Sequence, residues 1–70
     1  VEKEELYERV LMALNSLPAI YRDVMLLKHL RRMSYKAIAD FLNLAPATVE
    51  SRLYRAKLLL KERLQNIYAE

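Results

Sequence analysis

Apolar residues recur along most of the chain at the three- and four-residue spacing of amphipathic helices. The pattern is interrupted ahead of Pro18, at residues 31–33 and between Asn43 and Pro46. Proline is tolerated in the first turn of a helix, where its missing N–H leaves no hydrogen bond unmade. The pattern therefore predicts four helices, over residues 2–15, 18–30, 34–43 and 46–66.

The last two predicted helices are separated by a short break, which is typical of a helix-turn-helix over residues 34–66. The Ser34 hydroxyl can accept a hydrogen bond from a free N–H of the first turn, as an N-cap does. Asn43 stands where the chain leaves the helix, and Asn tolerates the left-handed backbone conformation best in a chain without Gly. Ala39 is small enough for a second helix to cross closely, and Leu44 is predicted to enter the core.

The last predicted helix has an apolar and a polar face when its residues are placed about 100° apart. The apolar stripe consists of Val49, Leu53, Ala56, Leu60 and Leu64. Largely opposite lie Ala47, Thr48, Ser51, Tyr54 and Arg55, with Arg52 and Lys57 at the borders. In a DNA-binding helix-turn-helix, the first turns of this helix contact base edges and bordering cations contact phosphates. We therefore predict that the stripe packs and that the opposite face binds double-stranded DNA.

Length and composition agree with one small all-α domain. The chain has 70 residues and no Cys, so no disulfide or thiolate metal site is available. No apolar run reaches membrane-spanning length, and the acidic opening VEKEEL is not a signal peptide. We expect residues 1–70 to form a single cytoplasmic domain that is a fragment of a longer protein.

The net charge of +3 is unevenly distributed. Residues 1–8 carry an acidic excess, and most cations lie between positions 28 and 61. Lys28, Arg31, Arg32 and Lys36 surround the entry to the predicted helix-turn-helix. Each alone could belong to a solvated charged surface, but the cluster favours phosphate contacts. Tyr35 is expected either to place its hydroxyl on a phosphate or to cover the edge of the core.

The second predicted helix is apolar around much of its circumference. Its apolar residues are Ile20, Tyr21, Val24, Met25, Leu26, Leu27 and Leu30. Such breadth predicts either burial on more than one side or docking of the first or second helix on a partner protein. The run Leu58, Leu59 and Leu60 leaves the same two alternatives open for the last helix.

Catalytic patterns are missing from the sequence. It has no Cys nucleophile, no Gly-rich phosphate loop and no HExxH or similar metal-ligand spacing. The single histidine, His29, lies at a helix end, where it interacts with the helix dipole or with solvent. We expect no enzyme activity, no cofactor or metal and no small-molecule substrate.

Three segments in order, LPAIYRDVMLLKHL, SYKAIADFLNL and ATVESRLYRAK, closely resemble region four of the extracytoplasmic-function sigma factors of bacterial RNA polymerase. The family patterns are LPxxxRxVxxL, SYxEIAxxL and GTVxSRLxRA. The resemblance covers the chain from Leu17 to about Leu64. It implies a four-helix domain of the winged-helix-like superfamily, without a wing, that binds the −35 promoter element and docks on the flap of the polymerase β subunit.

The resemblance also implies site residues and partners. The family's base and phosphate contacts map to Ala47, Thr48, Glu50, Ser51, Arg52, Tyr54 and Arg55. Together with Tyr35 and Lys36, these are the predicted DNA-binding residues. An anti-sigma factor is an expected further partner.

Some residues near the start of the last predicted helix depart from what is usual in the family. Ala47 replaces the usual Gly, and Ala45 stands where Ser often caps the helix, at a cost of about 1 kcal/mol. Glu50 stands where relatives commonly carry Lys or Arg. A carboxylate is repelled by phosphates unless it accepts from a cytosine amino group, so Glu50 is expected to alter the preferred bases.

Two other functions are compatible with the residues. A LuxR-type regulator would use a similar helix-turn-helix as a dimer, although SRLYRAK and its spacing favour a sigma factor. An interaction module with weakened DNA binding would use Glu50 and the spare leucines for a protein partner. The oligomeric state distinguishes the first of these from a monomeric sigma domain.

Overall fold

The computed structural model describes residues 2–68, with side chains described as far as residue 65. Four helices follow one another: α1 (Lys3–Asn15), α2 (Ala19–His29), α3 (Tyr35–Leu42) and α4 (Pro46–Tyr68). The described residues form no strand. The prediction of an all-α four-helix domain with a C-terminal helix-turn-helix and no wing is confirmed, and the helix ends differ from the predicted ones by at most two residues.

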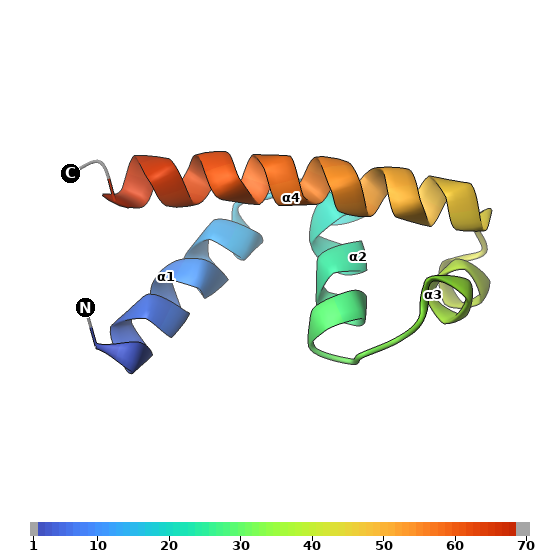
Figure 1. Ribbon diagram of the computed structural model, residues 1–70, viewed down its shortest axis with the longest axis horizontal. Helices are drawn as coiled ribbons and strands as arrows, with labels where there is room; N and C mark the ends of the chain where they lie inside the picture. Colours follow the sequence, from blue (N-terminus) through green and yellow to red (C-terminus); the bar gives the residue numbers. More distant parts are fainter. Residues whose placement is uncertain (1, 69–70) are drawn as a thin grey trace.

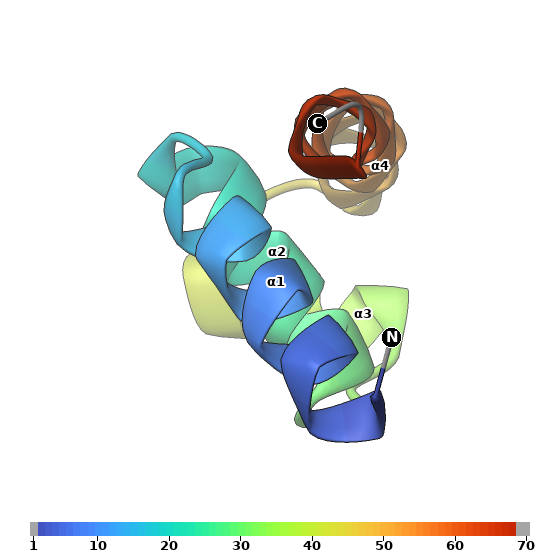
Figure 2. The same cartoon turned by 90° about the vertical axis from the view of Figure 1, so that its left-hand side faces the viewer.

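The long helix α4 is the common support of the other three (Figure 1). Helix α1 runs up to α4, the chain turns beside it, and α2 runs away from it again, while α3 lies near the start of α4. Viewed along α4, the other helices all lie to one side of it (Figure 2). None of the helices within residues 2–68 is long and apolar enough to cross a membrane.

The core lies where α2, α3 and α4 meet. Its buried residues are Val24, Met25, Ile38, Ala39, Val49, Leu53 and Ala56. Two of them are alanines, whose small side chains let the helix backbones approach closely. Leu44, Leu60 and Met33 are partly buried and pack against this cluster. The predicted stripe of α4 is confirmed, with Leu64 half-buried at its end.

Both predicted ends of α3 are confirmed. The Ser34 Oγ accepts a hydrogen bond from the backbone N–H of Ala37 at 3.1 Å. Asn43 has the left-handed backbone conformation, with φ 58° and ψ 51°. The N–H of Leu44 donates to the carbonyl of Ala39 at 2.8 Å, which is the bond that closes a Schellman-type helix end. This end reverses the chain and delivers Leu44 to the core.

A second left-handed residue, Arg32, was not predicted. Its φ of 55° costs about 1–2 kcal/mol for a residue that is not glycine. The turn that it makes lets the N–H of Met33 donate to the carbonyl of Leu27 at 3.1 Å. The side chain of Met33 packs against the core cluster immediately afterwards. Burial of Met33 thus offsets the strain at Arg32.

Helix α1 is the least buried of the four. Ala13 is buried and Val10 and Leu14 are half-buried, but Leu6, one turn before Val10, is exposed. The guanidinium of Arg63 on α4 donates to the Ser16 carbonyl at 3.3 Å and to its hydroxyl at 3.1 Å. The C-terminal end of α1 is therefore held against α4, while its first turns extend away from it.

Helix α2 is not buried around its whole apolar circumference. Val24 and Met25 are buried, but Ile20 and Leu30 are 48% and 59% exposed. Core packing alone therefore does not account for the breadth of apolar residues in this helix.

A pair of identical substitutions tests the position of the core. Ile38 is fully buried and Ile20 is about half exposed. Ile38→Val removes one buried methyl group and should lower the free energy of unfolding by about 0.5–1.5 kcal/mol. Ile20→Val should change it by less than about 0.5 kcal/mol. Urea unfolding followed by circular dichroism measures both, and equal effects would contradict this core.

Candidate nucleic-acid interface

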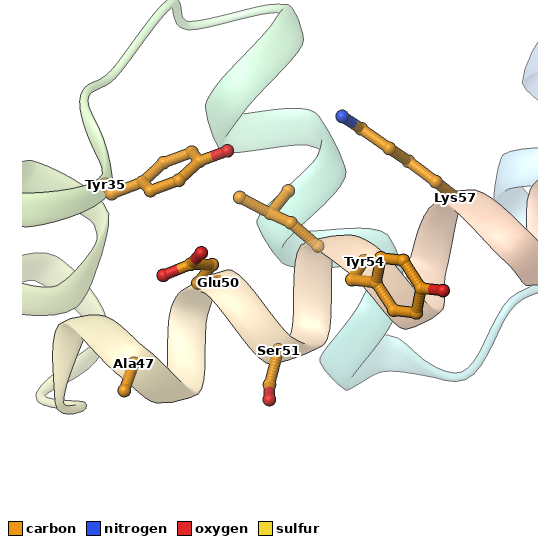
Figure 3. A pocket seen from close by; sticks show the side chains of 7 residues that line it. Tyr35, Ala47, Glu50, Ser51, Tyr54 and Lys57 are labelled. Carbon is orange, nitrogen blue, oxygen red and sulfur yellow. The ribbon is translucent and has the colours of Figure 1, made fainter.

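Burial of Val49 and Leu53 fixes the rotation of α4 about its own axis. Their exposed fractions are 0% and 2%, so the opposite side of the helix must face outward. Ala47, Ser51 and Tyr54 are all exposed on that side. Figure 3 shows Ala47 and Ser51 pointing the same way, away from α2 and α3. The structure thus brings these three predicted site residues onto one outer surface.

Glu50 lies on the flank of α4 that faces α3. It lines an open groove with Tyr35 and Lys57, and Ala47, Ser51, Leu53 and Tyr54 complete the lining. Figure 3 shows the Glu50 carboxylate turned toward Tyr35, at an angle to the row of Ala47 and Ser51. Glu50 therefore borders the outer surface of α4.

The ring of Tyr35 contacts Lys28, a residue for which the sequence predicted only phosphate contacts. The Lys28 Nζ lies 4.9 Å from the centroid of the Tyr35 ring, which is a cation–π contact. Tyr35 is 39% exposed, so part of its ring stays accessible. The contact joins the end of α2 to the start of α3. No periodicity in the sequence indicates it, because it forms across a loop.

The other flank of α4 differs from the prediction at one residue. Arg55 is exposed and Arg52 is half-buried, as suits a border position. Thr48 was expected on the exposed face but is half-buried. It directly precedes the buried Val49, only about 100° around the helix, so part of its side chain is covered. Less of Thr48 is therefore available to a ligand than of Ser51.

The cations around this surface form no ion pairs with the carboxylates whose positions the structure describes. Among the residues whose side chains are described, ion pairs join Arg9 to Glu5 at 2.9 Å and Arg22 to Asp23 at 3.6 Å, and none involves Lys36, Arg52 or Arg55. Such cations can replace the counterions of a nucleic-acid backbone. Within the described part of the chain, no three His, Cys, Asp or Glu side chains are grouped so that they could hold a metal ion.

The arrangement combines an exposed helix face, a capped helix start beside it and, at the borders, cations that pair with none of the described carboxylates. In comparisons with known proteins, the family model described as "Sigma-70, region 4" matches residues 7–60. No curated protein and no solved structure matched the chain. Region 4 of sigma factors is a non-catalytic DNA-binding domain with a general role in recognising the −35 promoter element, and it works with RNA polymerase. Since the match covers well over half of the sequence, the chain belongs to the sigma-70 region 4 family.

Proposed function

We propose that this domain reads the −35 promoter element with the first turns of α4 in the major groove, as part of an extracytoplasmic-function sigma factor. The observation that carries the proposal is the joint exposure of Ala47, Ser51 and Tyr54 opposite the buried Val49 and Leu53. The major groove of B-DNA is wide enough to admit an α-helix. A helix that is packed against the domain on one side and exposed on the other can enter this groove.

The side chains of this surface have different uses. Ala47 and Ser51 are small, so the backbone of α4 can approach the base edges closely. The Ala47 methyl suits contact with a thymine methyl, and the Ser51 hydroxyl can donate or accept a hydrogen bond. Tyr54 is large and 68% exposed, and it extends the contact surface along the groove.

The start of α3 suits a phosphate. Ser34 occupies only one of the free N–H groups there, and the others give a helix start its affinity for anions. Tyr35 and Lys36 are exposed beside it. We propose that these residues bind the DNA backbone and set the position of α4 in the groove.

Selection from a randomised duplex pool at low salt tests the function. We expect enrichment of one asymmetric site, because one copy of α4 reads one stretch of major groove. The selection should be made with the chain alone and with the chain fused to the polymerase β flap. An inverted repeat would point to a dimeric regulator instead, and no enrichment in either form would contradict promoter reading.

Two arginines on α4 should have separable roles. Arg55→Ala should weaken binding and relax the preference at one base position by about 1–3 kcal/mol, because Arg55 is exposed beside the outer surface. Arg52→Ala should weaken all sequences alike and make the salt dependence shallower, as loss of one phosphate contact does. Titrations at several salt concentrations measure both effects. If both variants keep the fold, as judged by an unchanged circular dichroism spectrum, and also keep the same affinity for DNA, this interface is wrong.

We further propose that the polymerase flap docks on α1 and the adjoining start of α2. Four large apolar residues there have exposed fractions between 43% and 67%: Leu6, Tyr7, Met12 and Ile20. Figure 1 places α1 toward the C-terminal end of α4, away from the end that adjoins α3. A partner on α1 would therefore leave the DNA-binding surface free. An anti-sigma factor that covers the same apolar residues would compete with the polymerase.

Loss of one apolar side chain tests this docking surface. Met12→Gln should weaken binding of the isolated β flap by about 1–2 kcal/mol, because a docked methionine would lose apolar burial. Leu58→Gln removes an exposed apolar side chain of α4 instead and should leave the flap affinity unchanged. Calorimetric titration gives both affinities. Equal effects of the two substitutions would place the flap on another surface.

A further inference from the structure

We infer that Glu50 selects a cytosine in the bound element by accepting a hydrogen bond from the exocyclic amino group of that base. This inference rests on the proposed insertion of α4 into the major groove. It concerns one residue whose charge is opposite to that of the surface around it.

The position of Glu50 permits a base contact. It is the fifth residue of α4, which begins at Pro46, and so lies within the first two turns that reach base edges in helix-turn-helix domains. Its side chain is exposed. In Figure 3 its carboxylate lies at the edge of the open groove beside the outer row of Ala47 and Ser51. A helix seated on that row would bring Glu50 alongside one neighbouring base pair.

Glu50 also has no partner among the side chains that the structure describes. Among the residues with described side chains, it makes neither an ion pair nor a hydrogen bond. Lys57 lines the same groove, and Lys28 is stacked on the ring of Tyr35. These cations favour phosphates on that side of the domain and counter the repulsion between the carboxylate and the DNA backbone. The free acceptor oxygens of Glu50 therefore meet the duplex without a competing internal contact.

The chemistry of base edges selects cytosine. An ionised carboxylate only accepts hydrogen bonds. In the major groove guanine presents two acceptors and thymine presents an acceptor and a methyl group, so both reject a carboxylate. Adenine places its amino donor directly beside the acceptor N7, whereas cytosine presents an amino donor alone. Cytosine is consequently the base that best satisfies Glu50.

Each substitution of Glu50 should change the preferred base in a way that depends on the new side chain. Gln binds adenine in two-point fashion and Lys binds guanine, while Ala offers no polar contact. In the duplex selection, the cytosine preferred by the natural sequence should become adenine in Glu50→Gln and guanine in Glu50→Lys. Glu50→Ala should leave that single position without preference. Glu62 is an exposed carboxylate further along α4, so Glu62→Gln, Glu62→Lys and Glu62→Ala are charge-matched controls that should all keep cytosine.

A modified base tests the atom itself. Replacing the selected cytosine by 2-pyrimidinone removes only the amino group. The natural sequence should then bind about tenfold more weakly, at the lower end of what a specific base contact contributes. Glu50→Ala should bind the two duplexes with nearly equal affinity, and this comparison removes the effect of the modified base on the duplex itself.

The outcomes separate this inference from the proposed function. An enriched site whose bases are the same for the natural sequence and all three Glu50 variants would overturn the role of Glu50 and leave promoter reading intact. Equal loss of affinity for the modified duplex in the natural sequence and Glu50→Ala would do the same. Absence of any enriched site, with or without the fused flap, would overturn the proposed function and the inference together.

Discussion

The structure depends on the packing of one stripe of α4 against the other helices. Helices α1, α2 and α3 each contact α4, and α2 also contacts α3. Val49, Leu53 and Ala56 are buried on α4, and they meet Val24, Met25, Ile38 and Ala39 in a single cluster. The alanines of α3 and α4 in this cluster allow the two helices to approach closely, and the cluster therefore packs without water between them. The domain has few other residues to bury. Without the stripe, the remaining helices would have no common surface to pack against.

The same stripe also determines what α4 presents to a ligand. Successive residues of a helix lie about 100° apart, so burial of Val49 leaves Ser51 pointing almost directly outward. A change in the core that rotated α4 by even one residue position would replace the outer row by its neighbours. Core packing would therefore be coupled to the proposed reading of DNA by α4. A substitution far from the DNA can alter recognition by changing the rotation of the helix, without touching any contacting side chain.

Much of this arrangement could be predicted from the sequence, because it follows from local rules. The cap at Ser34, the left-handed Asn43 and the stripe of α4 each depend on residues within a few positions of one another. The features that escaped prediction depend on how helices cross. Lys28 meets Tyr35 across a loop, and Thr48 is half covered. Arg32 adopts a positive φ in the turn just before the partly buried Met33, and no preference of arginine itself indicates this.

The small size of the domain bears on how it achieves specificity. With a net charge of +3 and a short exposed stretch of α4, the proposed surface would supply only a few phosphate and base contacts, which would limit the affinity of one domain for one site. Docking on polymerase would convert DNA binding into an intramolecular step with a high effective concentration, which raises the overall affinity without any new DNA contact. Under those conditions the DNA surface need not supply much binding free energy, but it must discriminate between sequences. A carboxylate at position 50 suits that task, because it disfavours three of the four bases at one position while adding little to the affinity for the backbone.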